Sequence, residues 1–365
     1  MRQVVVTAAP YCYGPTSKLL SIVEELRSTC LFVFVGYGAA WDLARTGPFH
    51  TCIRIDDRDR WSTDAISALR DASCLVSFLD YRSIKIAATL QVPCIFFDTL
   101  LWSRSSLPDN TENATEYIAQ RFFVTPDIHT PRPVHYVGAV LPKETVRKRR
   151  TLAHVHTLVN FGGLKSPAML PDADLNYVRW VVHILQRSAV PAAHLTFCLP
   201  RHLASAAHNI QMCLPQSSIE FPDPSAFADL LHRSCTLLTV PGLETVLEAL
   251  YLNKPMIFLP PYNGTQCLQL DIYEHLHIGA TLVPNTIARC HRANLQALTT
   301  TIQRANAFEQ ADKQHLDTLA MRLSGLVVDL HTEGAFANNG ACHSLLRDIG
   351  INGREETAAI ISRYC

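Results

Sequence analysis

Short, uninterrupted apolar runs alternate with amphipathic helical segments along this chain. The runs "QVVVTAA", "LFVFVG" and "PCIFFD" lack the polar residue at every second position that a half-exposed strand carries. Continuous apolar strands are buried on both faces, which is typical of parallel sheets covered by helices on each side. The pattern therefore predicts an α/β fold built on parallel sheets.

The alternation occurs twice, and the chain of 365 residues is long enough for two domains. It stops between residues 122 and 150, where prolines prevent a long helix and "RKRR" has no apolar face, and it restarts at "HTLVNFGG". We predict two Rossmann-like, doubly wound domains facing a central cleft. Their expected bounds are 1–145 and 151–335, followed by helices at 336–365 that pack back toward the first domain.

Charge and composition exclude several classes of partner. The 32 basic and 32 acidic side chains balance, so we expect no nucleic-acid partner and favour a solvated linker for "RKRR". No apolar run is long enough for a transmembrane helix, and the apolar part of "MRQVVVTAAPYC" is too short for a signal peptide. The 12 cysteines are scattered, which favours reduced thiols. We therefore expect a cytoplasmic protein, and the His and Cys spacings predict no metal site.

Two loops that follow strands of the second half carry glycines. Ligands of open α/β sheets bind beyond the carboxyl ends of strands. Gly162 and Gly163 follow "HTLVN" and allow close approach of a ligand to the backbone. Gly242 follows "CTLLTV" at the entry to a helix, whose amide groups and dipole favour an anion.

Thr245 and Glu248 lie three residues apart, on one side of the helix that follows Gly242. A hydroxyl at this position can bond a phosphate, and a carboxylate one turn further can accept hydrogen bonds from a ribose diol. The same spacing is also a capping box. If the helix begins at Gly242, Glu248 is too deep to cap it; if it begins at Thr245, the capping box is sufficient.

The continuation "KPMIFLPPYNGTQCLQL" predicts a short buried strand and then a polar loop with side chains that can bond sugar hydroxyls: Asn263, Thr265, Gln266 and Gln269. The order Gly, Thr-x-x-Glu-Ala-Leu, Lys-Pro, apolar strand, Pro and Gln-x-x-Gln resembles the donor-binding half of GT-B glycosyltransferases. It is most similar to the UDP-glycosyltransferases and the bacterial peptidoglycan N-acetylglucosaminyltransferase, over about residues 157 to 285.

The resemblance implies a hexosyltransferase that needs no cofactor besides its donor, a nucleotide-diphosphate sugar such as a UDP-sugar. It implies that the donor's diphosphate contacts Gly163 in the first loop and Gly242, Leu243 and Thr245 at the second. Gly162, next to Gly163, is expected to bind the donor as well. It further implies that Glu248 binds the ribose and that Gln266 and Gln269 bind the transferred sugar. The acceptor is expected to be a small molecule or a cell-surface precursor.

The chain departs from the family at its histidines. No histidine precedes Gly242, and "APYCYGPTSKL" keeps Gly14 but offers Thr16 or Ser17 where relatives carry a histidine that serves as base or acceptor ligand. A hydroxyl is a poor base at neutral pH. Asp80 and Asp98, which close two strands of the first domain, are the alternative bases, unless they are helix caps or turn residues.

We therefore expect a metal-independent glycosyltransferase that inverts the anomeric centre. Two alternatives stay open at this point: a sugar-nucleotide epimerase or hydrolase on the same fold, and a non-catalytic sugar-nucleotide-binding partner subunit.

Overall fold

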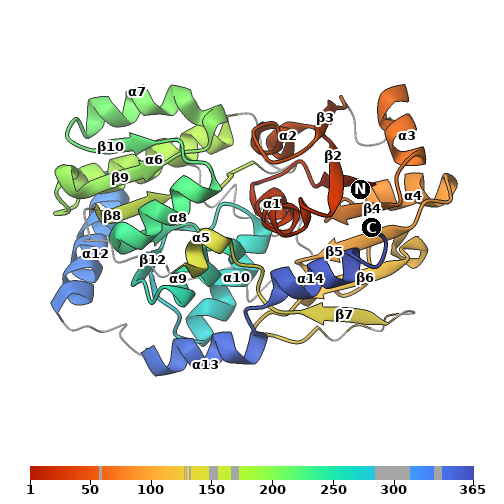
Figure 1. Ribbon diagram of the computed structural model, residues 1–365. Helices are drawn as coiled ribbons and strands as arrows, with labels where there is room; N and C mark the ends of the chain where they lie inside the picture. Colours follow the sequence, from red (N-terminus) through yellow and green to blue (C-terminus); the bar gives the residue numbers. More distant parts are fainter. Residues whose placement is uncertain are drawn as a thin grey trace. The chain divides into compact units, whose positions relative to one another are not determined.

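The computed structural model describes residues 1–56, 60–126, 128, 130, 133–147, 155–165, 172–283, 313–332 and 339–365 (Figure 1). The chain divides into two compact units. Unit 1 comprises Met1–Lys143 and Leu345–Cys365, and unit 2 comprises Glu144–Ser344. The first part of unit 1 ends at Lys143, whereas the sequence analysis placed the end of the first domain at residue 145.

Unit 1 is built on a seven-stranded parallel sheet. Its strands are β1 (Arg2–Ala8), β2 (Cys30–Gly36), β3 (Thr51–Arg54), β4 (Cys74–Phe78), β5 (Cys94–Asp98), β6 (Glu116–Gln120) and β7 (Val134–Val137). Their order across the sheet is β3-β2-β1-β4-β5-β6-β7, and every neighbouring pair is parallel. The order reverses at β1, which lies between β2 and β4, so the switch point of the sheet is beside the loop after β1.

Both faces of this sheet are covered by helices. Val4 and Val6 belong to a core that includes α1 (Gly14–Leu26), α2 (Gly38–Ala44) and α14 (Gly353–Ile361). Val5, between them, points to the opposite core, which includes α3 (Thr63–Arg70) and α4 (Tyr81–Thr89). Because alternate residues of β1 point to cores on opposite faces of the sheet, consecutive residues of the strand are apolar. The two covered faces confirm the predicted doubly wound α/β class.

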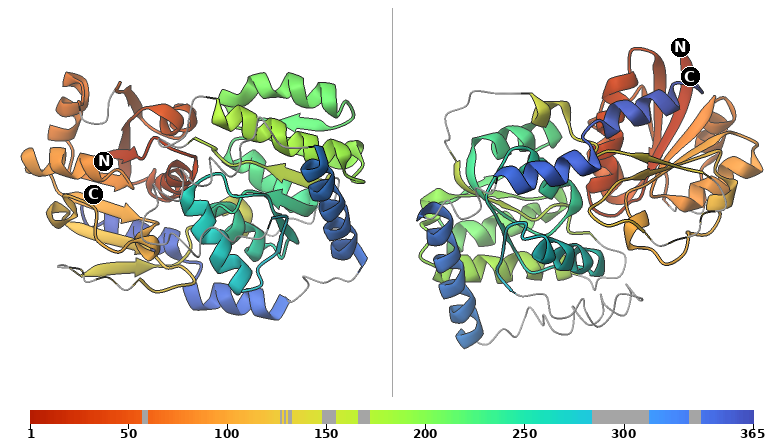
Figure 2. Two further views of the ribbon diagram at one scale, coloured as in Figure 1. Left: turned by 180° about the vertical axis from the view of Figure 1, so that it is seen from behind. Right: turned by 90° about the horizontal axis from the view of Figure 1, so that it is seen from below.

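The C-terminal segment packs against unit 1 through glycines. α14 lies beside α1, as the right view of Figure 2 shows, and it also contacts β7. A Cβ atom on Gly353 would lie 2.0 Å from the carbonyl oxygen of Gly138. Ala139 N donates to Gly350 O at 2.9 Å, and Gly138 N donates to Glu356 Oε2 at 2.8 Å. The backbones therefore approach too closely for larger residues.

Unit 2 repeats the architecture with six parallel strands in the order β10-β9-β8-β11-β12-β13. The strands are β8 (Val155–Asn160), β9 (Leu195–Cys198), β10 (Ser218–Glu220), β11 (Ser234–Thr239), β12 (Met256–Phe258) and β13 (Ala280–Thr281). Its helices include α6 (Ala173–Arg187), α7 (Ala204–Cys213), α8 (Pro224–Arg233), α9 (Leu243–Tyr251), α10 (Gly264–His275) and α12 (Lys313–Thr332). The helices α5 (Lys143–Val146) and α13 (Asn339–Ile349) span the two divisions between the units.

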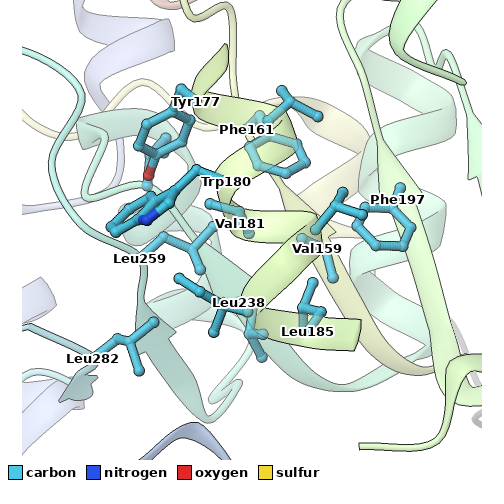
Figure 3. Close-up of a cluster of buried hydrophobic side chains, with 14 of the residues drawn as sticks. Val159, Phe161, Tyr177, Trp180, Val181, Leu185, Phe197, Leu238, Leu259 and Leu282 are labelled. Atoms are coloured by element: carbon cyan, nitrogen blue, oxygen red, sulfur yellow. The ribbon is translucent and has the colours of Figure 1, made fainter. Parts of the chain in front are cut away.

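A large apolar core joins α6 to the sheet of unit 2. Figure 3 shows Tyr177 and Trp180 of α6 packed near Val159 of β8 and Leu259, which follows β12. Tyr177 is fully buried, and its hydroxyl donates to the carbonyl oxygen of Pro260 at 2.5 Å. This bond fixes the start of the loop between β12 and α10.

Several elements differ from the sequence analysis. The segment around Asn263 was predicted as a polar loop, but α10 begins at Gly264 because the Asn263 side chain caps the helix by accepting from Gln266 N at 3.0 Å. The prediction of a break at 122–150 missed β7, and β6 was not recognised before it. No helix in the described part of the chain combines the length and apolarity needed to cross a bilayer.

Candidate functional site

The carboxyl ends of β8 and β11 lie side by side in unit 2, because Asn160 and Thr239 are partners in the parallel register. Each strand runs directly into one of the two glycine-bearing loops singled out in the sequence. Gly162 has φ +60, a backbone conformation that L side chains rarely adopt, so a glycine is required there by the chain itself. The two loops therefore share one edge of the sheet.

The start of α9 decides between the two interpretations of Thr245 and Glu248. Gly242 occupies the N-cap position and Leu243 is the first helical residue. Thr245 is thus the third helical residue and Glu248 the sixth, so these two side chains cannot form a capping box. Glu248 must have another role.

Gly242 has no structural need to be a glycine. Its φ is −87 and its ψ is 149, an extended conformation open to any residue. A Cβ atom at this position would find its nearest neighbour, Val240 O, 4.0 Å away. No side chain caps α9. The N-terminus of α9 therefore has no side-chain cap and would accept a Cβ atom at Gly242 without a clash, and uncapped helix N-termini of this kind bind anions in many α/β proteins.

Asn160, which sequence reasoning missed, connects the two glycine loops. Its Nδ2 atom donates to Thr239 Oγ1 at 3.3 Å and to Thr245 Oγ1 at 3.1 Å, and its Oδ1 atom accepts from Gly162 N at 3.1 Å. Asn160 is 6% exposed. The available signal was an amide side chain at the last position of a strand, directly before a glycine-bearing loop.

Glu248 is buried, and its Oε2 atom accepts a 2.6 Å hydrogen bond from Thr145 Oγ1. Thr145 lies on α5, at the beginning of unit 2, and is fully buried. Sequence reasoning missed Thr145 because it lies 103 positions away from Glu248.

The residues predicted to contact the sugar are mostly buried on or beside α10. Gln266 and Gln269 lie on the helix and are buried, and Asn263 is its N-cap. The side chain of Gln266 turns back and accepts from Tyr262 N at 2.7 Å. The side chain of Leu243 is also buried, so only its backbone can contact a ligand at the start of α9.

In unit 1, Gly14 opens α1 and Ser17 is half-buried. Thr16 is fully buried, and among the described residues its hydroxyl has no hydrogen-bond partner.

Asp98 is fully buried and accepts three hydrogen bonds. The donors are Leu100 N at 2.7 Å, Arg104 Nε at 2.9 Å and Tyr117 Oη at 2.8 Å. Burial and the negative charge of Asp98 raise the pKa of Tyr117 well above its ordinary value. These contacts fit the turn role that the sequence analysis weighed for Asp98, because all three donors are nearby groups of unit 1 that enclose the carboxylate.

Asp80 occupies the N-cap position of α4, but its side chain does not cap the helix. Its Oδ2 atom instead accepts from Thr7 Oγ1 at 3.3 Å, at the carboxyl end of β1. Leu79, directly before it, has φ +58, so this turn adopts a conformation that non-glycine residues seldom take. Asp80 is therefore held at the switch point of the unit 1 sheet.

A histidine and an aspartate also meet at the carboxyl edge of unit 2. His202, in the 3₁₀ turn after β9, places Nε2 2.9 Å from Asp174 Oδ2 in the first turn of α6. The His202 bond, stronger than the opposing effect of burial, lowers the pKa of Asp174. His202 Nδ1 is buried and has no hydrogen-bond partner in the part of the chain that the structure describes.

Several solved structures are similar to this chain along its whole length. They include Acinetobacter baumannii MurG, with 11% identity, 100% of both chains covered and a TM-score of 0.50. A glycotransferase of kitacinnamycin has 13% identity, with 100% of this chain and 98% of the other covered and a TM-score of 0.56. Phytolacca americana UGT2, complexed with UDP-2-fluoro-glucose and pterostilbene, has 12% identity, 100% of both chains covered and a TM-score of 0.53.

The chain has a GT-B glycosyltransferase-like fold. No protein-family model and no curated protein matches the sequence. At these identities the similarity concerns the fold, so the chemistry of this GT-B chain must be argued from its own residues.

Proposed function

We propose that this protein is a glycosyltransferase that binds a UDP-sugar on unit 2 and transfers the sugar to an acceptor. The observation that carries the proposal is Gly242, a glycine that neither its backbone angles nor its neighbours require, at the uncapped N-terminus of α9. A ligand that comes close to the backbone explains a glycine there, and the amides of the helix favour a diphosphate.

The rest of the donor follows from the spacing along α9 and α10. Gly162, Gly163, Leu243 and Thr245 would contact the diphosphate, and Glu248 the ribose. Gln266 and Gln269 would contact the sugar, Gln266 through its amide nitrogen, since its Oε1 atom accepts from Tyr262 N. The UDP-2-fluoro-glucose in the similar UGT2 structure supports a UDP-sugar as the donor.

In the proposed reaction a nucleophile of the acceptor forms a bond to the anomeric carbon, and the bond from that carbon to the diphosphate oxygen breaks. The electron pair leaves with UDP, and the amides at the start of α9 stabilise its charge without a metal. The acceptor proton passes to a base. Asp80 is the candidate that we retain, since the contacts of Asp98 favour a structural role.

Thermal-shift measurements with UDP-, TDP- and GDP-sugars test the donor site. We expect a UDP-sugar to raise the melting temperature of the wild type and to raise that of Gly242→Ala much less. Gly325→Ala is the matched control, because a Cβ atom there meets nothing within 4 Å in the middle of α12. No stabilisation by any donor, or equal stabilisation of Gly242→Ala, would exclude the proposed site.

A non-catalytic sugar-nucleotide-binding protein is the second candidate, and it is favoured by the three donors that occupy Asp98. Release of UDP from a bound UDP-sugar, followed over time, separates the two. Release supports the transferase, whereas binding without release supports the second candidate. Interconversion of the sugar nucleotide without release would indicate an epimerase instead.

A further inference from the structure

The chain passes through unit 1 twice, and the two passages lie side by side. It leaves unit 1 after an outgoing segment, residues 138–143, and re-enters it shortly before a returning segment, residues 350–356. The amide of Ala139 donates to Gly350 O at 2.9 Å, and the carbonyl oxygen of Ala139 accepts from Gly353 N at 3.2 Å. The outgoing and returning segments are therefore adjacent within unit 1.

Glu25, in the last turn of α1, contacts both segments through one oxygen atom. Its Oε2 atom lies 3.1 Å from Nζ of Lys143 in the outgoing segment and 3.3 Å from Nε of Arg354 in the returning segment. Oε2 is buried and has no hydrogen-bond partner among the described residues, so these two ion pairs compensate the burial of its charge. Arg354 also contacts the neighbouring Glu355, whose side chain is 49% exposed.

Two cations that share one carboxylate oxygen repel each other once the negative charge is removed. The side chain of Arg354 is only 11% exposed, so solvent screens its charge less than that of an ordinary surface arginine. Loss of the Glu25 charge therefore does more than remove two attractions. It leaves Lys143 and Arg354 as a repulsive pair that pushes the two segments apart.

We propose that Glu25 is an electrostatic latch that fastens both passages of the chain to the end of α1. The helix begins at Gly14, after the loop at the switch point of the unit 1 sheet, and its last turn carries the latch. A single helix thus connects that loop to the segments by which the chain leaves and re-enters unit 1. The latch adds to the backbone pairing of Ala139 and does not depend on the proposed function.

Two independent surface ion pairs make a different prediction. If Lys143 and Arg354 contact Glu25 without influencing each other, removal of the Lys143 charge has no effect once the Glu25 charge is gone. If they share a latch, removal of the Lys143 charge loosens the segments when Glu25 is present and tightens them when it is absent. The sign of the effect therefore separates the two cases.

Hydrogen exchange of the full chain, followed by mass spectrometry of peptides that cover the two segments, measures how often they open. We expect both segments to exchange about fivefold faster in Glu25→Gln than in the wild type, and about twofold faster in Lys143→Met. The double variant of Glu25→Gln with Lys143→Met should exchange about twofold more slowly than Glu25→Gln alone, because the repulsion is gone. Glu24→Gln is the matched control on the same helix, since it removes only an ion pair to Arg27, and it should exchange like the wild type.

Ionic strength provides a second readout. An increase from about 0.05 M to about 0.5 M salt shortens the Debye length and weakens both attraction and repulsion between charges. The two segments should therefore exchange faster at high salt in the wild type and more slowly at high salt in Glu25→Gln. The same response to salt in both proteins would contradict the latch.

Unchanged exchange in Glu25→Gln would overturn the latch. So would a double variant that exchanges as fast as Glu25→Gln alone, which is the result expected of independent ion pairs. If Glu25→Gln does not fold, the wild type and Lys143→Met decide the question. Exchange that responds neither to salt in the wild type nor to the loss of the Lys143 charge would then overturn the proposal.

Discussion

Asn160 Nδ2 lies 3.1 Å from Thr245 Oγ1, and this contact ties the loop after β8 to the first turn of α9. The two residues are 85 positions apart in the sequence. Because Asn160 also accepts from the amide of Gly162, one side chain sets the spacing of both loops that we assign to the diphosphate.

Replacement of Asn160 by Asp is expected to weaken UDP binding about tenfold or more, since the new carboxylate cannot donate to Thr245 and repels the diphosphate. Asn160→Ala should weaken UDP binding less and lower the free energy of unfolding by about 1–3 kcal/mol, because buried donors and acceptors lose their partner. Calorimetry with UDP and urea unfolding measure the two effects. Equal affinity in the wild type and Asn160→Asp would contradict the role given to this residue.

Gly353→Ala is expected to destabilise unit 1 by about 3 kcal/mol, since its Cβ atom would lie 2.0 Å from a backbone oxygen that cannot move away. Gly325→Ala, in open space on α12, should instead be neutral or stabilising by up to about 1 kcal/mol. Urea unfolding of the two variants tests the close approach of the C-terminal segment to Gly138. A loss below about 1 kcal/mol in Gly353→Ala would show that the backbones are further apart.

The fold could be predicted from the sequence because its strands are continuous apolar runs, such as "CIFF" in β5, that only a sheet buried on both faces explains. A helix after Gly242 could be predicted because a Pro-Gly pair follows an apolar strand, but the sequence left open whether it begins at Gly242 or at Thr245. These signals are local.

Thr145 and Asn160 could not be found in the same way, because their partners lie 103 and 85 positions away and only the fold brings them together. Asn263 was misread for a different reason. Asn-Gly is a common turn signal, whereas here the asparagine caps a helix that continues for 12 residues. The role of Asp98 likewise depended on Arg104 and Tyr117, which sequence analysis did not connect to it.

Arg104→Met is expected to lower the free energy of unfolding by about 3–5 kcal/mol, because it leaves the buried carboxylate of Asp98 without its cationic partner. Arg187→Met removes a more exposed ion pair, to Asp317, and should change stability by less than about 1 kcal/mol. Chemical denaturation of the two variants and the wild type measures these changes in the free energy of unfolding. Similar small losses in both variants would mean that Asp98 does not depend on Arg104.

Glu116 predicts a pH-dependent contribution to stability. Burial alone would raise its pKa, but hydrogen bonds from Tyr364 and His135 outweigh burial and hold the pKa below its ordinary value. A carboxylate with a lowered pKa in the folded state stabilises it above the unfolded-state pKa, and this stabilisation is lost as the pH falls through the folded-state pKa. Glu116→Gln should therefore be less stable than the wild type at about pH 7, and the difference should be smaller at about pH 3, below the ordinary pKa of Glu. A difference that is unchanged between these pH values would argue against this role for the charge of Glu116.

Asp80→Asn tests the base that we retain. If Asp80 accepts the acceptor's proton, the variant should release UDP from a UDP-sugar about 100-fold more slowly or worse while it binds UDP with unchanged affinity. The amide is nearly isosteric and can still accept from Thr7 Oγ1, so this contact is kept, and the rate is compared per folded molecule. Asp98→Asn is the contrasting variant: it should lose stability, because Arg104 and Tyr117 then face a neutral amide, and keep its rate of release per folded molecule. The opposite outcome, a slow but stable Asp98→Asn and an active Asp80→Asn, would transfer the role of base to Asp98.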